Sequence, residues 1–364
     1  MEGMGPVDPN FWRGRRVLLT GHTGFKGSWL ALWLETLGAE VVGLSRGIPT
    51  TPSLFELARV GEGVRTLDGD VRDLQAVERA VEDSRAEVVL HMAAQSLVRR
   101  SFERPVETYA TNVMGTVHVL DAARRTGGVR VVVNVTSDKC YENREWVWGY
   151  REHEPMGGHD PYSNSKGCAE LVTSAFRRSF GQEEGSPAIA SARAGNVIGG
   201  GDWAEDRLIP DLMQAAVAGR PAIIRNPDAI RPWQHVLNPL SGYLILAQSL
   251  WDARELSEGW NFGPEDGDAR PVRWIIERLG EAWGEPIPWR QQEGEAPHEA
   301  RYLKLDSSKA RTRLGWTPVW GLADALTSIA TWYRTERSGG DLRGHALDQI
   351  AAFQAGDPPP KAAS

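Results

Sequence analysis

The chain of 364 residues is 41% hydrophobic and carries a formal net charge of −7, with a pI near 5.7. This length allows one large α/β domain and a smaller second one, and the acidic balance argues against a nucleic-acid partner, which needs a basic face. No stretch approaches the roughly 18 uncharged apolar residues of a membrane span, so we expect no membrane partner.

Two features bear on the compartment. Residues 1–10 lack the basic and apolar regions of a signal peptide. Cys140 and Cys168 have no metal-ligand spacing. We therefore expect free thiols, no metal site and a cytoplasmic location.

The first half of the chain alternates apolar strands with helices. The expected strands are Arg16–Thr20, Glu40–Leu44, Val64–Asp68, Val88–Met92, Arg130–Thr136 and Ala188–Arg193. The expected helices are Ser28–Leu37, Leu74–Asp83, Val106–Arg125 and Tyr162–Phe180. This alternation predicts βαβ units and a Rossmann-type, doubly wound parallel sheet covered on both faces.

The rhythm changes after Gly195, where Gly and Pro interrupt shorter elements. Helices are expected near 208–218, 239–251 and 272–283. We predict a dinucleotide-binding domain over residues 13–195 and a smaller C-terminal α/β lobe over 196–340 that mainly binds substrate. Residues 1–12 are expected to form a loose arm, and residues 355–364, which contain three consecutive prolines, a disordered tail.

A glycine-rich turn joins the first strand to the first helix. Its spacing is G-x-x-G-x-x-G, and glycines at this junction let backbone amides approach a pyrophosphate at the helix N-terminus. Such turns also close for packing reasons, but the position after the first strand favours a dinucleotide. The expected cofactor-binding residues of the turn are Gly21, Thr23, Gly24, Phe25, Lys26 and Gly27.

Further cofactor contacts are expected at the ends of the next strands. The second strand ends in Ser45 and Arg46 rather than in the acid that holds the adenosine ribose of NAD, so NAD is expected but NADP is not excluded. Arg46 is equally well explained as an exposed arginine. The other expected cofactor residues are Asp70 and Val71 after the third strand, Ala93, Ala94 and Gln95 after the fourth, and Asn112.

Tyr162 and Lys166 are the strongest catalytic candidates. A spacing of four residues places both on one helix face. We expect the ammonium and an oxidised nicotinamide to lower the tyrosine pKa, which makes the phenol a usable base, and both residues to contact the cofactor. Tyr-x-x-x-Lys occurs by chance in many helices, but the βαβ pattern that precedes it favours a catalytic role here.

Ser137, Asp138 and Lys139 follow the fifth strand. Ser137 is expected to hydrogen-bond the substrate hydroxyl that is oxidised. Asp138 and Lys139 add an acid/base pair that a simple dehydrogenase does not need. The alternative is a charged turn with no chemical role.

These motifs resemble the extended short-chain dehydrogenase/reductases that modify nucleotide sugars and, more narrowly, the CDP-glucose 4,6-dehydratase family. The resemblance covers about residues 12–335. The stretches that carry it are GHTGFKGSWL (21–30), TSDKCYENREW (136–146), RAGNVIGGGDW (193–203), RPWQHV (231–236) and LDSSKA (305–310). Its most specific element is Asp138–Lys139, because the related dTDP-glucose enzymes carry Asp-Glu there.

The resemblance implies a 4,6-dehydration of a nucleotide-linked hexose with internally recycled NAD. Tyr162 would take the 4-hydroxyl proton, Lys139 the C5 proton, and Asp138 would protonate the departing 6-hydroxyl. These protonation states of Asp138 and Lys139 require large pKa shifts, so Lys139 could instead stabilise the enolate by its charge. The resemblance further implies substrate contacts from Ser137, Asn196, Arg231 and Arg301, and a homodimer or homotetramer.

Other functions stay open at this point. An epimerase or a dehydratase of a dTDP-, GDP- or UDP-hexose would use the same fold. A dehydrogenase would release reduced cofactor. A non-catalytic dinucleotide sensor would keep the glycines but would not need Ser137, Tyr162 and Lys166 together.

Overall fold

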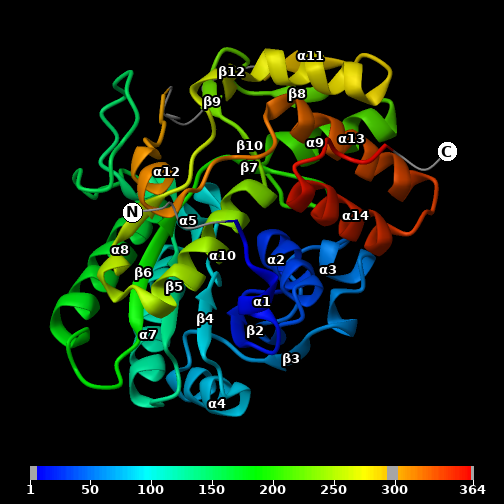
Figure 1. Cartoon of the computed structure of the whole chain (residues 1–364). Helices are drawn as coiled ribbons and strands as arrows, with labels where there is room; N and C mark the ends of the chain where they lie inside the picture. The colour runs from blue at the N-terminus through cyan, green and yellow to red at the C-terminus, as the bar shows by residue number, and fades with distance from the viewer. Residues whose placement is uncertain (1–5, 293–301, 362–364) are drawn as a thin grey trace.

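The structure, a computed structural model, describes residues 6–292 and 302–361. At its centre is a seven-stranded sheet in the order β3-β2-β1-β4-β5-β6-β11, with every neighbouring pair parallel (Figure 1). The strands are β1 Arg16–Thr20, β2 Glu40–Ser45, β3 Arg65–Asp68, β4 Val88–His91, β5 Val131–Val135, β6 Ala188–Arg193 and β11 Gly259–Asn261. The Rossmann-type sheet and the six expected strands are confirmed. The strand order reverses between β1 and β4, and such a reversal opens a crevice at the carboxyl ends of the strands.

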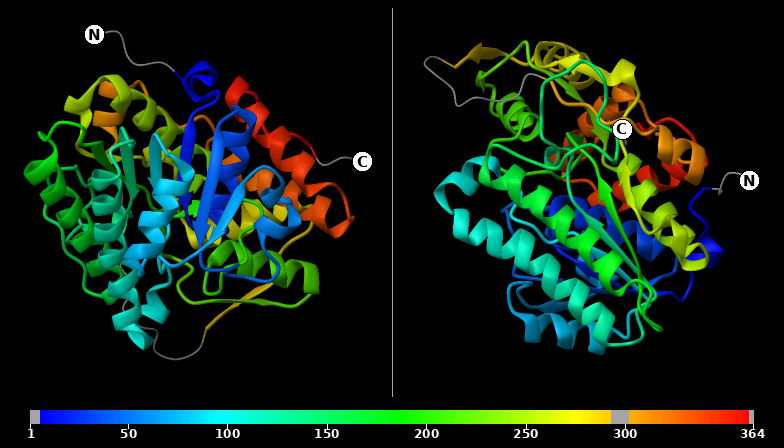
Figure 2. Two further views of the ribbon diagram at one scale, coloured as in Figure 1. Left: turned by 90° about the horizontal axis from the view of Figure 1, so that it is seen from below. Right: turned by 90° about the vertical axis from the view of Figure 1, so that its left-hand side faces the viewer.

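Helices cover both faces of the sheet, as the two views of Figure 2 show. Alternate residues of β1 face opposite cores: Val17 and Leu19 pack with α2 and α10, and Leu18 packs with α4 and α7. Burial on both faces explains why these strands are continuous apolar runs. The helices of this half are α1 Pro9–Trp12, α2 Phe25–Thr36, α3 Leu54–Leu57, α4 Leu74–Ser84, α5 Val98–Glu103, α6 Pro105–Tyr109, α7 Gly115–Arg125 and α8 Pro161–Phe180, with short turns η1 Val60–Glu62 and η3 Asp138–Cys140.

The single helix expected over residues 106–125 is interrupted. Between α6 and α7 the chain forms a π-helical turn, η2 Ala110–Met114. Such turns widen a helix by one residue and often lie at functional sites. Here the turn carries the buried Asn112. A π-helical turn adds one residue to a helix, and the apolar periodicity of the sequence does not reveal a single added residue. The sequence therefore could not predict this interruption.

The C-terminal half contains a lobe of short elements, but part of it returns to the main sheet. The helices and the short turn of the lobe are α9 Leu208–Ala218, α11 Val272–Trp283, α12 Ser308–Leu314, α13 Leu322–Arg337 and η5 Asp266–Asp268. Its strands form three pairs: β7 Val197–Ile198 with β10 Gln234–His235, β8 Ala222–Ile224 with β13 Trp289–Gln291, and β9 Ile230–Pro232 with β12 Ala269–Pro271. By contrast, α10 Leu237–Asp252 packs on β5 and β6, and β11 forms the seventh strand. The turn η4 Arg254–Leu256 lies between α10 and β11, and the last helix, α14 Leu342–Ala355, packs on α2. The expected domain boundary at residue 195 therefore needs correction, because α10 and β11 pack with the main sheet. The sequence did not indicate β11 because an apolar pattern of three residues is too short to identify a strand.

Both ends of the described chain are more ordered than expected. Residues 9–12 form α1, and Trp12 is fully buried, so the loose arm does not extend to residue 12. At the other end, Trp320 Nε1 donates to the Asp357 carbonyl at 2.8 Å and Pro359 is buried, so residues 356–361 are not a free tail. Composition alone could not show these contacts because both partners are remote in sequence. Within the described residues no helix is long and apolar enough to cross a membrane.

Candidate functional site

One cleft of about 790 Å³ lies at the carboxyl ends of the strands, between the sheet and the C-terminal lobe. It brings together the expected residues Gly21, Thr23, Gly24, Phe25, Lys26, Gly27, Ser45, Arg46, Asp70, Val71, Ala93, Ala94, Gln95, Ser137, Asp138, Lys139, Tyr162, Lys166, Asn196 and Arg231. Asn112 does not line it, and Arg301 lies outside the described residues.

The glycine turn forms a bare backbone cradle at the N-terminus of α2. Gly21 has φ +75°, and a Cβ there would lie 2.8 Å from the Ala93 backbone. A Cβ on Gly27 would lie 2.2 Å from the Gly21 carbonyl oxygen. Side chains are therefore excluded where β1 meets α2. The cradle leaves backbone N–H groups at a helix N-terminus, which suits a dinucleotide diphosphate.

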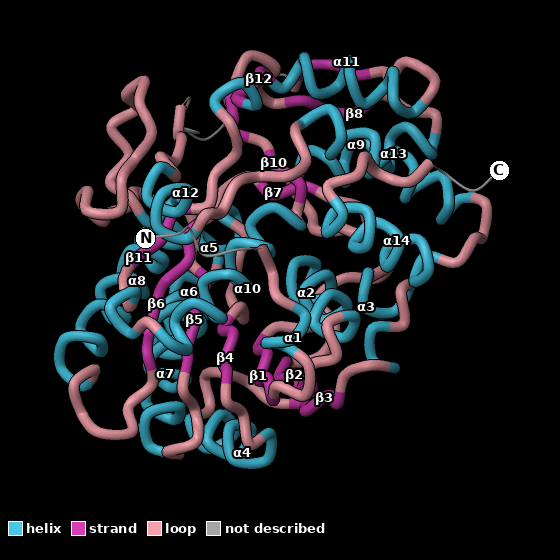
Figure 3. Tube along the Cα trace, viewed as in Figure 1, coloured by secondary structure: helices cyan, strands magenta, loops and turns pink. Residues whose placement is uncertain are grey.

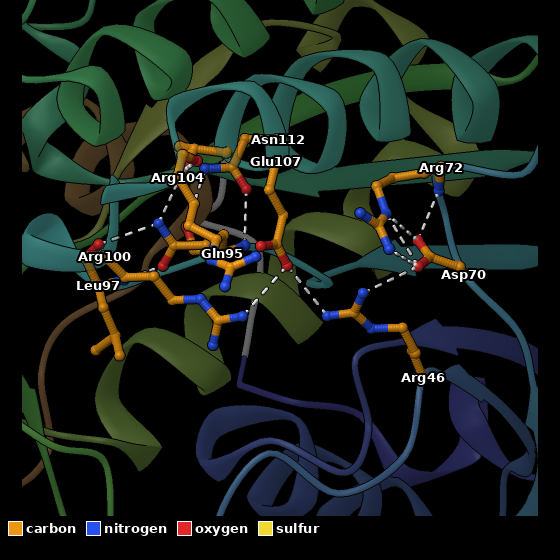
Figure 4. Close-up of polar contacts among 10 residues, drawn as sticks. Arg46, Asp70, Arg72, Gln95, Leu97, Arg100, Arg104, Glu107 and Asn112 are labelled. Carbon is orange, nitrogen blue, oxygen red and sulfur yellow. Dashed lines mark hydrogen bonds and ion pairs between the residues drawn. The ribbon is translucent and has the colours of Figure 1, made fainter. Parts of the chain in front are cut away.

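Ion pairs connect the ends of β2 and β3 to α6 (Figure 4). Arg46 lies 3.5 Å from the Asp70 carboxylate and 3.3 Å from Glu107. Arg72 and Arg100 pair with the same two carboxylates at 2.6 and 3.3 Å. The hydrogen bond from Arg72 lowers the pKa of Asp70. The Arg46 charge is thus already shared with two carboxylates at the edge of the cleft.

Asn112 supports the cleft wall from behind. Its Oδ1 accepts a hydrogen bond from the Gln95 backbone N–H at 2.8 Å, and its Nδ2 donates to the Gln95 carbonyl and to Ser165 Oγ, both at 2.9 Å. The side chain of Gln95 is held in turn by Thr108. Asn112 therefore holds the loop after β4 against α8, and its expected contact with a cofactor stays a prediction.

The first turn of α8 fixes the orientation of Tyr162. Asp160 caps the helix by accepting from the Ser163 N–H at 2.9 Å, and Pro161 occupies the first helical position. The Tyr162 N–H donates to Ser101 Oγ at 3.1 Å. Lys166, one turn later, donates to the Val135 carbonyl at 3.4 Å. Both side chains are buried at the base of the cleft.

Burial sets the ionisation of this pair. Burial raises the pKa of Tyr162 to about 12, although the hydrogen bond with Ser137 acts in the opposite direction and lowers this pKa. Burial lowers the pKa of Lys166 to about 8, although the negative charge of Glu170 acts in the opposite direction and raises this pKa. In the protein without cofactor, desolvation of the phenolate outweighs the neighbouring charges, and the expected lowering of the tyrosine pKa by an oxidised nicotinamide stays a prediction.

Ser137 connects the tyrosine to the acid/base pair. Its hydroxyl donates to Asp138 Oδ1 at 2.9 Å, and Lys139 Nζ lies 3.9 Å from the same oxygen. Asp138 is 1% exposed, and its Oδ2 has no hydrogen-bond partner among the described residues. A Cβ at Gly195 would lie 1.9 Å from that oxygen, so only glycine leaves room for the carboxylate.

Lys26 turns from the glycine turn toward the catalytic residues. Its Nζ donates to the Tyr243 hydroxyl at 2.9 Å. Burial, followed by repulsion from Lys166 and Arg207, lowers its pKa to about 7. Its expected contact with a cofactor stays a prediction.

The lobe side of the cleft includes an arginine that the sequence motifs did not mark. Arg207 donates to Asp202 Oδ2 at 2.9 Å and to Ser96 Oγ at 3.3 Å, and its charge lowers the pKa of both Tyr162 and Lys26. Its position at the N-terminus of α9, soon after the loop 199–203, is the signal that could have identified it. Asn196, at φ +39°, has a buried Nδ2 without a hydrogen-bond partner among the described residues.

A doubly wound parallel sheet with a glycine cradle and a Tyr–Lys pair at one strand-end cleft defines a nicotinamide-dependent enzyme of the extended short-chain dehydrogenase/reductase type. The chain belongs to the NAD dependent epimerase/dehydratase family, whose model matches residues 17–256. It is 55% identical over 341 residues to the CDP-glucose 4,6-dehydratase of Salmonella typhimurium (strain LT2), covering 92% of this chain and 95% of that protein.

Solved structures agree in fold. The dTDP-glucose 4,6-dehydratase of Streptomyces venezuelae, crystallised with NAD, superimposes with a TM-score of 0.75 at 26% identity and covers 90% of this chain and 99% of its own. The UDP-glucose-4-epimerase of Stenotrophomonas maltophila gives a TM-score of 0.78 at 22% identity, with 90% and 100% covered. At that identity the epimerase supports the fold alone.

Proposed function

We propose that this chain is a CDP-glucose 4,6-dehydratase, a hydro-lyase that converts CDP-D-glucose to CDP-4-keto-6-deoxy-D-glucose and water with NAD recycled in each cycle. The observation that carries the proposal is the position of Asp138 and Lys139 in the same cleft as Tyr162 and Lys166. An oxidation site and an elimination site are then adjacent. The 55% identity to a CDP-glucose 4,6-dehydratase supports the choice of nucleotide.

The residues present fit NAD. The cradle around Gly21 and Gly27 would hold its diphosphate, and Asp70 and Val71 its adenine. A 2′-phosphate approaching Arg46 would also meet Asp70 and Glu107, which favours NAD over NADP. When bound, NAD would supply a reversible hydride carrier between C4 and C6 of the hexose, so the reaction would involve no net oxidation.

Tyr162, Lys166 and Ser137 serve the oxidation. Tyr162 takes the 4-hydroxyl proton, and the Lys166 ammonium stabilises the phenolate that precedes this step. Ser137 hydrogen-bonds the same hydroxyl and holds it toward the tyrosine. Their burial at the base of the cleft strengthens these interactions because water is excluded.

Asp138 and Lys139 serve the elimination. Oxidation at C4 acidifies the C5 proton, which Lys139 removes, while Asp138 donates a proton to the departing 6-hydroxyl. If Lys139 stays an ammonium, its charge stabilises the enolate instead. The Ser137 hydroxyl contacts both Tyr162 and Asp138, so one residue aligns the two halves of the reaction.

The lobe holds the nucleoside diphosphate. Asn196 and Arg231 line the cleft beyond the catalytic residues. A guanidinium can donate two hydrogen bonds to phosphate oxygens, which suits it to this task. We include Arg301 in this group on the basis of the motif, although it lies outside the described residues.

Assembly as a homodimer or homotetramer is part of this proposal. Exposed apolar side chains lie on neighbouring helices, with Val106 81% and Leu171 59% exposed on α6 and α8. Phe102 on α5 and Met114 on η2 are also exposed. An isologous contact between two copies would bury them. Sedimentation at micromolar concentration tests this, and a species of 40.1 kDa contradicts it.

Mass spectrometry after incubation with CDP-, dTDP-, GDP- and UDP-hexoses tests the reaction. Loss of one water from CDP-glucose alone is the expected result. Water loss from another nucleotide sugar would change the substrate, and isomerisation without water loss would favour an epimerase. Net accumulation of reduced nicotinamide would indicate a dehydrogenase. A cytoplasmic location, also proposed, is tested by cell fractionation.

A further inference from the structure

A buried ion pair lies directly behind the catalytic residues. Arg193 Nη2 and Glu170 Oε2 are 2.7 Å apart, and their side chains are 4% and 2% exposed. The Glu170 carboxylate also accepts hydrogen bonds from Thr136 Oγ1 at 2.5 Å and from Ser191 Oγ at 2.6 Å. The carboxylate therefore joins two other elements, β6 and the end of β5, to its own helix α8.

Glu170 lies where the two catalytic elements meet. On α8 it follows Tyr162 and Lys166 at successive intervals of four residues, which places all three on one helix face. Thr136, which donates to it, directly precedes Ser137 and Asp138. One carboxylate thus connects the helix that carries the oxidation residues with the strand end that carries the elimination residues.

The pair also reaches toward the lobe through Arg193. Its Nη1 donates to the Tyr141 hydroxyl at 2.6 Å and to the Glu152 carbonyl at 3.0 Å. Tyr141 in turn donates to Asn261 Oδ1 at 2.8 Å. Asn261 Nδ2 continues to the carbonyls of Tyr150 and Asp306, so the network contacts the loop that follows η3, drawn in pink in Figure 3. A Cβ at Gly259 would lie 2.3 Å from Arg193 Nη2, which leaves the guanidinium little freedom to move.

We propose that Glu170 is a positioning residue of the reaction: by binding Thr136 it holds Ser137 and Asp138 in register with Tyr162 and Lys166. This rests on the proposed function, since it concerns the alignment of the oxidation and elimination groups. Two other contacts join β5 to α8, Asn134 to Thr173 and Lys166 to the Val135 carbonyl. Among these contacts, that of Thr136 is nearest in sequence to the acid/base pair.

Glu170 has a second consequence, for the charge on Lys166. The titratable groups that interact electrostatically with Lys166 are Glu170 on its own helix, Cys140 on η3, Lys26 on α2 and His91 on β4. Glu170 is the carboxylate in this set, and its attraction opposes the burial that lowers the pKa of Lys166. Neutralising Glu170 therefore shifts the Lys166 pKa further down.

A matched pair of variants tests the positioning role. Thr136→Val and Ser191→Ala each remove one hydroxyl donor from the same carboxylate and leave the ion pair with Arg193 intact. We expect Thr136→Val to lower kcat about tenfold or more with KM within about twofold, because a 1 Å misplacement of a catalytic group costs up to about a hundredfold. Ser191→Ala should keep both parameters within about twofold.

Glu170→Gln tests the effect on charge. The pH at which kcat falls on the alkaline side should move down by about one unit, the shift expected for loss of one nearby opposite charge. A merely structural defect would lower kcat at every pH without moving this limb. Because this variant leaves Arg193 buried without its carboxylate, the two hydroxyl variants alone decide the positioning role if Glu170→Gln does not fold.

The rate of nicotinamide reduction in a single turnover and the steady-state kcat and KM are measured with the nucleotide hexose that the wild-type protein dehydrates. Equal effects of Thr136→Val and Ser191→Ala, or no effect of either, overturn the inference while the proposed function stands. A wild-type protein that dehydrates no nucleotide hexose overturns the proposed function, and this inference with it.

Discussion

The cofactor side and the nucleotide-sugar side of the cleft are built differently. On the cofactor side, the expected residues follow the ends of β1 to β4, where a regular sheet repeats the same geometry. On the other side, contacts come from strands of two or three residues and from the loops between them. This difference teaches that site residues can be predicted from sequence where they follow the ends of regularly repeated strands. They are much harder to predict where the backbone is irregular.

The largest effect is expected at the catalytic helix. Tyr162→Phe removes one hydroxyl from a side chain that is already buried, so fold and nucleotide-sugar affinity should stay close to wild type. Turnover should fall about a hundredfold or more, the usual contribution of an acid/base group. Circular dichroism serves as the folding control. Near-normal turnover would remove Tyr162 from the mechanism.

Asp138→Asn should separate oxidation from elimination. The carboxamide keeps the shape that Gly195 accommodates but cannot donate the required proton to the 6-hydroxyl. Single-turnover absorbance should then show reduced nicotinamide accumulating while product formation drops about a hundredfold. If the rates of reduction and of water loss decline in parallel, the two groups do not divide the reaction as proposed.

Arg231→Ala and Arg301→Ala should act on the nucleotide-sugar side alone. Each removes charge-assisted hydrogen bonds worth about 1.5 to 3 kcal/mol, so KM should rise roughly tenfold or more. Affinity for free NAD should hardly change, because the cradle lies on the other side. The exposed Arg278 of α11, paired with Glu281, gives the matched control Arg278→Ala, which should leave KM unchanged. An arginine variant that loses NAD affinity but keeps its KM would contradict this division of the cleft.

The smallest expected effect is the alkaline decline in rate. Burial lowers the pKa of Lys166 to about 8, so the ammonium dominates at pH 7 and is half lost at pH 8. If the ammonium form supports oxidation, kcat falls as the pH rises through about 8, and the value at pH 8 is about half the plateau. A profile that is flat up to pH 9 would exclude a titrating Lys166.

Much of the candidate site was predictable because its residues lie at fixed offsets from regular elements. Tyr162 and Lys166 are one helical turn apart, and Ser137 to Lys139 directly follow a strand, so local spacing was sufficient to pair them. Arg207 was missed because its relation to Tyr162 depends on how the lobe folds back over the sheet. The hydrogen bonds of Asn112 behind the cleft wall were not foreseen because they join the loop after β4 to α8, which lie far apart in the sequence.

The sequence by itself determined the parallel sheet, the glycine turn and the set of candidate catalytic residues, because each depends on periodicity and spacing within a few tens of residues. Only the tertiary structure decided that β11 completes the sheet and that both ends of the described part of the chain pack against the rest. The same holds for the high pKa of Tyr162 and for the contact of Glu170 with both catalytic elements. Burial and long-range contacts arise from residues distant in the chain, and the free energy of desolvation depends on all of them together.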